Sequence, residues 1–435
     1  MSTIDRTDVV VIGGGLGGLT AAAYLARSGA SVTVCEKARG LGGRAATHQE
    51  HGFLWNLGPH ALYAGSEGIR ALRELEVPFR GHKPSATGAY GVYRGRKHAL
   101  PGGPVSLLIT GLLGVKGKLE IARLLGSLPK LEVAKATGQS VAEWLLANVR
   151  DEVARALVQA LFRVSTYANA PKLQDAGTAL HQLQLALSDG VLYLDGGWQT
   201  LVDGLRERAV SAGASLVTGA RVAELEHRHG IVEAVRLADG RRIVTDAVVI
   251  AGSPGDAAAL LPQSERAQAW AKQLIPVKAA CLDLALRRLP QPRATFALGI
   301  DQPLYLSVHS AVAGLAPEGN ATVHVAKYLP CGADSEAKSD RAELEALMDT
   351  VQPGWRGELV ADRFLPSMVV THALVTADMN GYRGRPAAEL DDLSGVYLAG
   401  DWVGSQGMLA DATIASGRAV AQQIALRRRQ VAAAA

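Results

Sequence analysis

Three glycines near the start of the chain have the spacing of a phosphate-binding loop. Gly13, Gly15 and Gly18 form G-x-G-x-x-G between the apolar run VVVI and the small-residue run TAAAYLA. In such a loop the first glycine permits a tight turn, the second lets a pyrophosphate approach the backbone, and the third lets helix and strand pack closely. Glu36 follows at roughly the ~20-residue spacing at which a carboxylate can bind ribose hydroxyls. The pattern predicts a dinucleotide site; the alternative is a plain turn and a surface glutamate.

A second glycine loop, which contains an arginine, follows the glutamate directly. It reads GLGGRAAT over residues 40–47, with Gly42 and Gly43 preceding Arg44. Glycines allow close backbone approach, and a guanidinium can form paired hydrogen bonds with a phosphate. The alternative is a flexible loop with a solvated arginine. The glycines alone do not distinguish a nicotinamide dinucleotide from a flavin dinucleotide.

An aspartate and a helix near the end of the chain favour the flavin. Asp401 follows the apolar run VYLA in the sequence AGDW, where its carboxylate suits a polyol hydroxyl. A helix is expected to begin near Met408, and its N-terminal N–H groups would stabilise the negative charge of a reduced flavin. One extended cofactor would then explain why both ends of the chain read as strand, glycine loop and helix.

The elements that must position these groups follow from the hydrophobic periodicity. Residues 8–12 and 31–37 are predicted strands and residues 16–28 the helix between them, which together make a βαβ unit. Residues 195–254 read as a helix followed by two pairs of strands, with a hairpin turn at Asp239–Gly240.

Composition excludes several classes of function. The chain has 435 residues, 48% of them hydrophobic, and a net charge of +4, which suits an enzyme of two or three domains. Its basic residues are scattered and not interleaved with aromatic ones, which argues against nucleic acid as a partner. No HExxH spacing or cysteine cluster is present, so no metal is expected. The three cysteines form no CxxC and favour a reducing compartment, so a cytoplasmic location is expected.

Together these motifs resemble the FAD-dependent amine oxidase/phytoene desaturase superfamily, and within it the phytoene dehydrogenase-like branch. The resemblance is carried by VVVIGGGLGGLTAAAYLA, EKARGLGGR, DGGWQTLVDGL, VVIAGSP and GVYLAGDW…ATIASGRAVA. It implies non-covalent FAD and an α/β fold, in which a discontinuous Rossmann-like FAD-binding domain of the glutathione reductase/amine oxidase type carries an inserted α+β substrate domain. The FAD-binding domain would comprise residues 1–65, 190–270 and 385–435, and the substrate-binding domain residues 66–189 and 271–384.

The resemblance also implies roles for individual residues. Glu36 would hold the adenosine ribose, and Arg44 would bind the pyrophosphate with the first glycine loop. The Val222 backbone would meet the adenine, Asp401 the ribitol, and Met408–Leu409 the isoalloxazine. The cofactor-binding residues expected on this basis are Gly13, Gly15, Leu16, Gly17, Gly18, Glu36, Lys37, Gly42, Gly43, Arg44, Gly58, Pro59, His60, Val222, Gly252, Gly400, Asp401, Met408 and Leu409.

The substrate side carries fewer signals. Amine oxidases of this superfamily commonly hold the amine between two aromatic rings, one of them from the start of the last helix. Leu409 or Met408 takes that place here, which argues against a simple primary-amine oxidase. Lys278 corresponds to a lysine that these oxidases often carry near flavin N5, where it could position water. Tyr305 and His309 lie on an alternating strand and are further catalytic candidates; for all three the alternative is a structural role.

These inferences predict an FAD-dependent oxidoreductase that desaturates a small, largely apolar substrate by hydride transfer to flavin N5. The alternatives are oxidation of a C–N bond in a cyclic or secondary amine, and an FAD-binding protein that binds a partner without catalysis. The electron acceptor (O2, a quinone or a nicotinamide) and the oligomeric state stay open. The apolar run 105–115 and the amphipathic stretch 118–128 could line an apolar entrance or contact a membrane surface peripherally. Burial of both inside the substrate domain is the favoured alternative.

Overall fold

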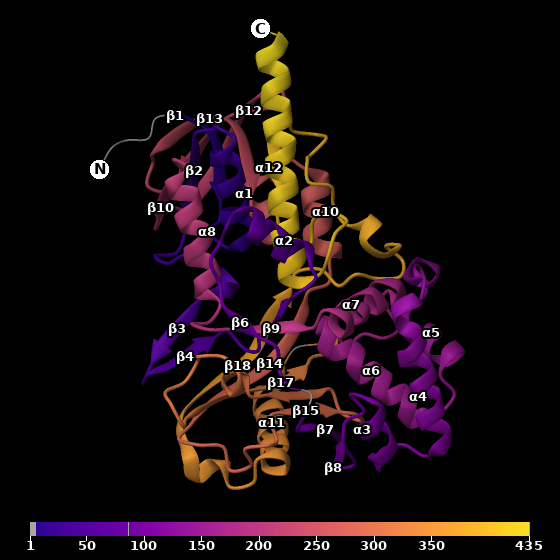
Figure 1. Cartoon of the computed structure of the whole chain (residues 1–435). Helices are drawn as coiled ribbons and strands as arrows, with labels where there is room; N and C mark the ends of the chain where they lie inside the picture. The colour runs from indigo at the N-terminus through magenta and orange to yellow at the C-terminus, as the bar shows by residue number, and fades with distance from the viewer. Residues whose placement is uncertain (1–5, 86, 334, 435) are drawn as a thin grey trace.

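The computed structural model of the protein describes residues 6–85, 87–333 and 335–434, which are organised around two seven-stranded sheets (Figure 1). In the first sheet, five strands are parallel, and β12 and β11 extend it as an antiparallel hairpin. The turn after β12 contains Asp239–Gly240, as predicted. The strands of the first sheet, in spatial order, are β10 (Ser215–Thr218), β2 (Val32–Glu36), β1 (Arg6–Ile12), β13 (Arg242–Ile250), β12 (Ile231–Leu237) and β11 (Val222–Arg228), with β19 (Val396–Leu398) also paired to β13.

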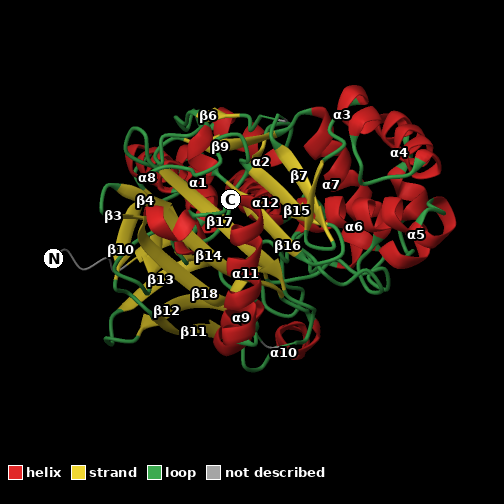
Figure 2. Ribbon diagram, turned by 90° about the horizontal axis from the view of Figure 1, so that it is seen from below, coloured by secondary structure: helices red, strands yellow, loops and turns green. Residues whose placement is uncertain are grey.

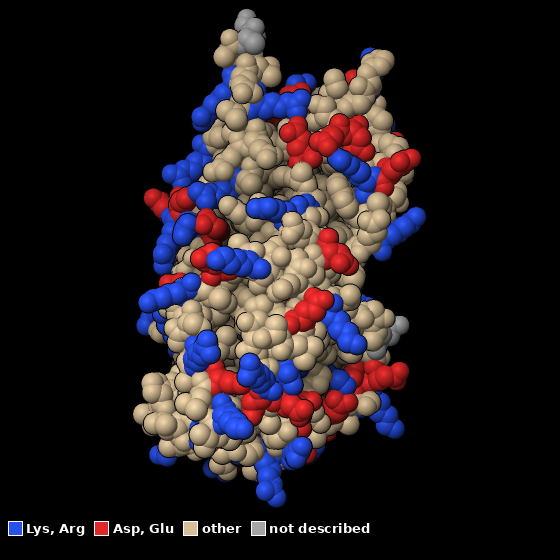
Figure 3. All heavy atoms as spheres, turned by 90° about the vertical axis from the view of Figure 1, so that its right-hand side faces the viewer, with Lys and Arg blue, Asp and Glu red and all other residues tan. Residues whose placement is uncertain are grey.

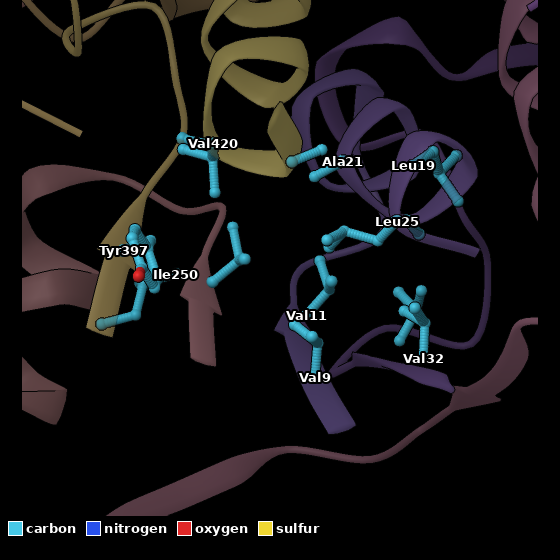
Figure 4. Close-up of a cluster of buried hydrophobic side chains, with 14 of the residues drawn as sticks. Val9, Val11, Leu19, Ala21, Leu25, Val32, Ile250, Tyr397 and Val420 are labelled. Carbon is cyan, nitrogen blue, oxygen red and sulfur yellow. The ribbon is translucent and has the colours of Figure 1, made fainter. Parts of the chain in front are cut away.

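The core of this half lies between the first sheet and two helices, α1 (Leu16–Arg27) and α12 (Leu409–Ala434) (Figure 4). The valines of β1 are fully buried, as expected for a parallel strand covered on both faces. The two helices pack closely because Gly17 and Gly417 lie at their contact, where a Cβ on Gly417 would overlap the Gly17 carbonyl oxygen. The other helices of this half are α2 (Glu67–Glu74), α8 (Gln199–Ser211), α9 (Pro254–Leu260) and α10 (Glu265–Gln273).

The second sheet lies below the first in Figure 1 and is antiparallel except for one pair, β15 with β7. Helix α11 (Ala337–Val351) packs against one face, and the opposite face contributes to a second buried cluster. Its strands, in spatial order, are β18 (Leu359–Thr371), β14 (Val277–Leu286), β17 (Ala321–Tyr328), β16 (Leu304–Ser307), β15 (Phe296–Gly299), β7 (Ala89–Tyr93) and β8 (Arg96–Ala99).

A group of helices lies beside the second sheet, at the lower right of Figure 1 and the upper right of Figure 2. Several of these helices begin at a capping side chain: Ser140 accepts a bond from the Glu143 N–H, Asp151 from Ala154 and Asp175 from Thr178. The group comprises α3 (Pro104–Ile109), α4 (Val115–Ser127), α5 (Val141–Asn148), α6 (Glu152–Thr166) and α7 (Ala176–Ser188).

Short strands join the two halves. One pair is β3 (Thr47–Glu50) with β4 (Phe53–Asn56), and a small sheet has the order β5 (Leu62–Tyr63), β9 (Val191–Leu194), β6 (Gly81–His82). The predicted α/β architecture is confirmed. Helix α2, placed by the sequence in the substrate domain, packs against α12 of the first half. Within the described residues, no helix combines the length and the apolar character needed to cross a membrane.

Candidate active site

One cavity runs between the two halves and reaches both glycine loops. Its volume is about 1710 Å³, more than the ~300–1,000 Å³ of a typical small-molecule site, so it has room for a dinucleotide and a second molecule. Its walls come from both sheets and from the helix group. We call the part lined by the first half, including Gly15, Glu36 and Val222, the cofactor arm. The part lined by α6, α7, β15 and β16 is the substrate arm.

The first glycine loop forms the floor of the cofactor arm. Gly13 has a left-handed backbone (φ +111°), and a Cβ on Gly18 would overlap the Gly13 carbonyl oxygen, so both positions need glycine for the fold itself. Gly15 differs: its φ of −82° is open to any residue, and a Cβ there would come no closer to another residue than 3.9 Å, to the Gly42 carbonyl oxygen. The space beside Gly15 belongs to the cavity, which fits the close approach of a pyrophosphate.

Glu36 is held in place at the end of β2. One of its carboxylate oxygens accepts a bond from the Gly14 N–H (2.6 Å) and the other from the Ala38 N–H (2.8 Å). The carboxylate lines the cavity and keeps lone pairs for ribose hydroxyls. Lys37 also lines the cavity, where its ammonium forms an ion pair with Asp256 (3.0 Å).

Arg44, Asp401 and His372 meet in the middle of the cavity wall. The Arg44 guanidinium donates to the Asp401 carboxylate (2.7 Å) and to the Val370 carbonyl oxygen (2.7 Å). His372 approaches the other oxygen of Asp401 through its backbone N–H (3.2 Å) and its ring Nδ1 (3.1 Å). This network fixes Asp401 and joins the second glycine loop, β18 and the loop after β19 at one point.

Asp401 is ionised in this network. The side chain is 1% exposed, and burial by itself would raise its pKa. The Arg44 guanidinium and the His372 ring reverse that effect and hold the pKa of the carboxyl well below its ordinary value. The buried carboxylate is therefore charged, and it can accept a hydroxyl hydrogen bond from a ligand in the cavity.

His60 is a neutral ring at the junction of the two arms. Burial lowers the pKa of His60 to about 4. Its Nδ1 lies 3.1 Å from the Gly58 carbonyl oxygen and its Nε2 3.1 Å from the Arg44 carbonyl oxygen, so a neutral ring can donate to only one of them. The edge of His60 also packs on Trp198, which makes it a wall residue that supports the loop of Arg44.

Leu409 lines the cavity at the N-terminus of α12 in a strained conformation. Its φ is +58°, the left-handed region that leucine rarely adopts, at a cost of about 1–3 kcal/mol. Bonds on either side fix it: Arg385 donates to the Gly407 carbonyl oxygen (2.8 Å), and Thr413 donates to that of Leu409 (3.2 Å). The free N–H groups of the helix start and an aliphatic side chain therefore face the cavity together.

The substrate arm is apolar with tyrosines at its inner end. Leu161, Val164 and Leu183 line it from α6 and α7, and Phe296 and Leu298 from β15. The tyrosine hydroxyls bond to protein groups: Tyr63 donates to the Ser165 carbonyl oxygen (2.7 Å), Tyr167 to that of Pro59 (3.2 Å), and Tyr193 bonds with Ser307 (2.9 Å). Burial raises the pKa of each of these hydroxyls, so they stay protonated.

Most of the residues predicted from the sequence line this cavity. Gly18, Gly58 and Met408 lie behind its wall: Gly18 packs on Gly13, Gly58 on Cys281 and Met368, and Met408 is 3% exposed. The predicted residues that do line the cavity are Gly13, Gly15, Leu16, Gly17, Glu36, Lys37, Gly42, Gly43, Arg44, Pro59, His60, Val222, Gly252, Tyr305, Gly400, Asp401 and Leu409.

Two catalytic candidates need correction, because Lys278 and His309 do not reach the cavity. Val277 and Ala279 pack in the same cluster as Tyr305, so the alternation of β14 directs Lys278 to the opposite face of the sheet. His309 is 1% exposed and stacks behind Tyr193, with ring centroids 3.8 Å apart. Burial lowers the pKa of His309 well below its ordinary value, so it is a neutral packing residue.

Sequence reasoning missed His372 and Tyr193. His372 follows a 13-residue strand that begins in the far half of the molecule, and nothing in its local sequence indicates that this strand ends beside Asp401. Tyr193 lies on the four-residue strand β9. Its local sequence, YLDGG, carries no chemical information by itself.

Asp411, in the first turn of α12, is a buried carboxyl that the sequence did not single out. Burial raises its pKa to about 6, although the Ser66 hydroxyl and the Gly68 N–H (2.9 Å) bond to it. Because the folded pKa lies above the ordinary value of 3.8, the favourable contribution of Asp411 is complete below about pH 4 and is lost as pH rises through 6.

We therefore predict that Asp411→Asn, which keeps an acceptor for the Gly68 N–H, removes this pH dependence. The wild-type free energy of unfolding should fall relative to the variant by about 3 kcal/mol between pH 4 and 7. Urea unfolding of both proteins across this pH range measures the difference. The lowered pKa of His60 changes stability with pH in the opposite direction, but both proteins contain His60, so its effect cancels in the comparison. Asp203→Asn, at an exposed position on α8, is the control. Parallel curves for wild type and Asp411→Asn would contradict the prediction.

The residues of the cofactor arm fit FAD. The arm offers open space at Gly15, a fixed carboxylate at Glu36, a cation at Arg44, an ionised acceptor at Asp401 and a helix N-terminus at Leu409. Together these groups offer what an adenosine ribose, a pyrophosphate, a ribitol and a flavin ring each require.

Comparison with known proteins agrees with this site. The model of the family "flavin containing amine oxidoreductase" matches residues 16–425. A carotenoid 3,4-desaturase from Haloarcula japonica is 51% identical over 59 residues, which is 14% of this chain and 12% of that protein. A limonene dehydrogenase component from Castellaniella defragrans is 51% identical over 63 residues, 14% of this chain and 11% of that protein. The chain thus matches only a short part of the length of either relative.

A solved structure shares the fold over nearly the whole chain. The oxidoreductase from Methanosarcina mazei superimposes with a TM-score of 0.77 at 20% identity, covering 95% of this chain and 100% of that one. Because the family model spans both halves of the fold and the cavity carries the residues that FAD needs, the chain belongs to the flavin containing amine oxidoreductases.

Proposed function

We propose that this enzyme desaturates a small, largely apolar substrate. The observation that supports it is the wall of the substrate arm: within the described residues, the lining outside the first half contains no Asp, Glu, Lys or Arg. An amine is an ammonium ion at neutral pH, and burying it without a counter-ion is costly. An uncharged hydrocarbon needs no counter-ion, and contact with leucine, valine and phenylalanine side chains favours its binding.

The residues of the chain would bind and orient the substrate. Bound FAD supplies a two-electron acceptor at the junction of the arms. Leu161, Phe296 and Leu298 would hold the reacting carbon in place and exclude water from it. Tyr167 and Tyr193 present protonated hydroxyls that are already bonded to the protein, so a role in shaping the site suits them better than proton abstraction. The similarity to a carotenoid desaturase and a limonene dehydrogenase supports a hydrocarbon substrate.

Product analysis tests this proposal. FAD-loaded protein is incubated with a panel of apolar alkenes and polyenes, each with O2, a quinone or NAD(P)⁺ as acceptor, and products are analysed by mass spectrometry. The expected product has lost two hydrogens and gained one C=C bond. An imine that has lost two hydrogens would instead establish C–N oxidation, and so would its hydrolysis products: a carbonyl compound plus a smaller amine from an acyclic secondary amine, or one ring-opened amino-carbonyl compound from a cyclic amine.

A variant whose substrate arm is blocked tests whether the reaction takes place in this arm. Leu161→Trp would fill part of the arm from α6, so turnover should fall at least tenfold while the FAD content stays unchanged. Leu146→Trp on α5, where the side chain is 66% exposed, is the control and should turn over normally. Equal turnover in the two variants would show that the reaction takes place elsewhere.

A further inference from the structure

Helices α3 and α4 expose large apolar side chains at one corner of the molecule. Val105, Leu108 and Ile109 on α3, and Val115 and Leu119 on α4, are each 67–76% exposed. We call these five residues the apolar corner. In Figure 3 an uncharged lobe lies at the lower left, where the views of Figures 1 and 2 place α3. The sequence favoured burial of the run 105–115 inside the substrate domain; this is wrong for Val105, Leu108, Ile109 and Val115, whereas Leu112 and Leu113 are buried.

Packing within the chain does not account for this exposure. Helix α3 contains one valine, two leucines and one isoleucine in six residues, yet no residue of α3 is buried. The following residues Leu112 and Leu113 are buried, so the segment is anchored while α3 projects outward. Lys118 fixes α3 against α4 by donating to the Leu108 carbonyl oxygen (2.6 Å). An exposed apolar surface of this kind is typical of a site that contacts another molecule or a membrane.

The cavity reaches the apolar corner. Beyond the substrate arm its lining continues to Pro104, Leu107 and Leu108 on α3 and to Ala122 and Leu125 on α4. Leu108 therefore both lines the cavity and belongs to the exposed set. The lining of the cavity therefore extends from the cofactor arm to α3 and α4, the two helices that carry the apolar corner.

Basic side chains without an acidic partner lie near the corner, although acidic side chains share this face of the molecule (Figure 3). Lys116 and Arg123 on α4 and Arg96 and Lys97 on the neighbouring strand β8 are exposed, and within the described part of the chain no carboxylate lies within ion-pair distance of any of them. Strand β8 lies against α3, since Thr110, just after that helix, donates to the Ala99 carbonyl oxygen (2.6 Å). The acidic side chain on α4, Glu120, accepts bonds from the Arg150 and Asp151 N–H groups and so is held back toward the protein.

We propose that the apolar corner docks on a lipid surface that carries anionic headgroups. Short helices with exposed valine, leucine and isoleucine beside lysine and arginine suit the boundary between headgroups and acyl chains. With six and thirteen residues, α3 and α4 are shorter than the ~20 that span a bilayer, so they would lie in the interface. In this position the end of the cavity lined by α3 and α4 lies next to the membrane, and an apolar substrate passes from the acyl layer into the cavity. This last step rests on the proposed function; the docking itself does not.

Vesicle flotation of the FAD-loaded full-length protein tests the docking. Vesicles of phosphatidylcholine with phosphatidylglycerol are compared with phosphatidylcholine alone. The wild type should float with the anionic vesicles, bind neutral ones at least tenfold more weakly, and lose binding as salt rises. Ile109→Ser/Leu119→Ser should reduce partitioning at least tenfold, and Lys116→Gln/Arg123→Gln should remove the preference for anionic lipid. None of these four residues lines the cavity, so FAD absorbance and turnover of a detergent-dispersed substrate should be unchanged.

Ile231→Ser/Leu426→Ser is the matched control, because it removes two equally large side chains, 55% and 58% exposed, from the first half. It should float like the wild type. Failure of the wild type to float with anionic vesicles would overturn the proposal, and so would equal binding by the corner variant and the control. A wild type that forms dimers or larger oligomers, dispersed by Ile109→Ser/Leu119→Ser, without floating would assign the corner to a second copy instead. Because flotation needs no turnover, these outcomes are independent of whether desaturation is the reaction.

Discussion

Gly15→Val is expected to give a folded protein that is purified without FAD. The backbone of Gly15 has φ −82° and ψ −177°, which valine adopts without strain. A Cβ there meets no neighbour closer than 3.9 Å, so the chain itself does not require glycine. The added side chain would occupy the space through which the pyrophosphate passes. We expect FAD affinity to fall at least ~100-fold, or about 2.7 kcal/mol, with little change in stability.

Titration of the apoprotein with FAD, followed by quenching of flavin fluorescence, measures this loss, and thermal unfolding of the apoprotein measures stability. Gly40→Val is the control, since a Cβ on Gly40 has nothing within 4 Å and this residue does not line the cavity. Gly18→Ala should behave oppositely and lose stability, because its Cβ would overlap the Gly13 carbonyl oxygen. Normal FAD binding by Gly15→Val would refute the assigned path of the pyrophosphate.

Arg44→Met is expected to cause the largest loss of stability. It would leave the Asp401 carboxylate, 1% exposed, with only His372 as a partner, and it would remove the bond to the Val370 carbonyl oxygen. Arg44 is 37% exposed but Asp401 is buried, so the remaining charge stays buried and the cost should approach the ~3–5 kcal/mol found for a fully buried pair. FAD binding should weaken as well, since the guanidinium faces the cavity.

A second substitution separates these two effects. Arg44→Met/Asp401→Asn removes the unpaired charge, so most of the stability should return while FAD binding stays weak. Arg39→Met, at an exposed position shortly before this loop, should leave both properties unchanged. Urea unfolding of the apoproteins provides the comparison. A cost below about 1 kcal/mol for Arg44→Met, typical of surface ion pairs, would mean that the network does not hold Asp401 in place.

The cofactor arm was predictable because its chemistry is local in the sequence. The spacing of Gly13, Gly15 and Gly18, the position of Glu36 and the second glycine loop are each contained in a short stretch whose strand–loop–helix pattern is visible in the hydrophobic periodicity. The parallel pairing of β1, β2 and β13 then brings these loops to one edge of the sheet.

The Arg44–Asp401–His372 network could not be predicted as a unit. Arg44 and Asp401 are separated by 357 positions along the chain, and Arg44 and His372 by 328. Their contact depends on the path of β18 from the second sheet back to the cavity, which no local pattern specifies. Lys278 shows a related limit: the resemblance suggested its role, but only the packing of β14, on which it lies, decides which face of the sheet it occupies. The exposure of α3 is likewise a property of packing and not of composition.

Anaerobic mixing of the FAD-loaded protein with candidate substrates tests the central claim most directly, namely that one cavity holds FAD in one arm and an apolar substrate in the other. The measured quantity is the bleaching of the visible flavin absorbance. We predict that apolar alkenes or polyenes bleach the flavin, that small amines do not, and that Leu161→Trp slows the bleaching at least tenfold. Rapid bleaching by small amines, with none by any alkene, would contradict the account.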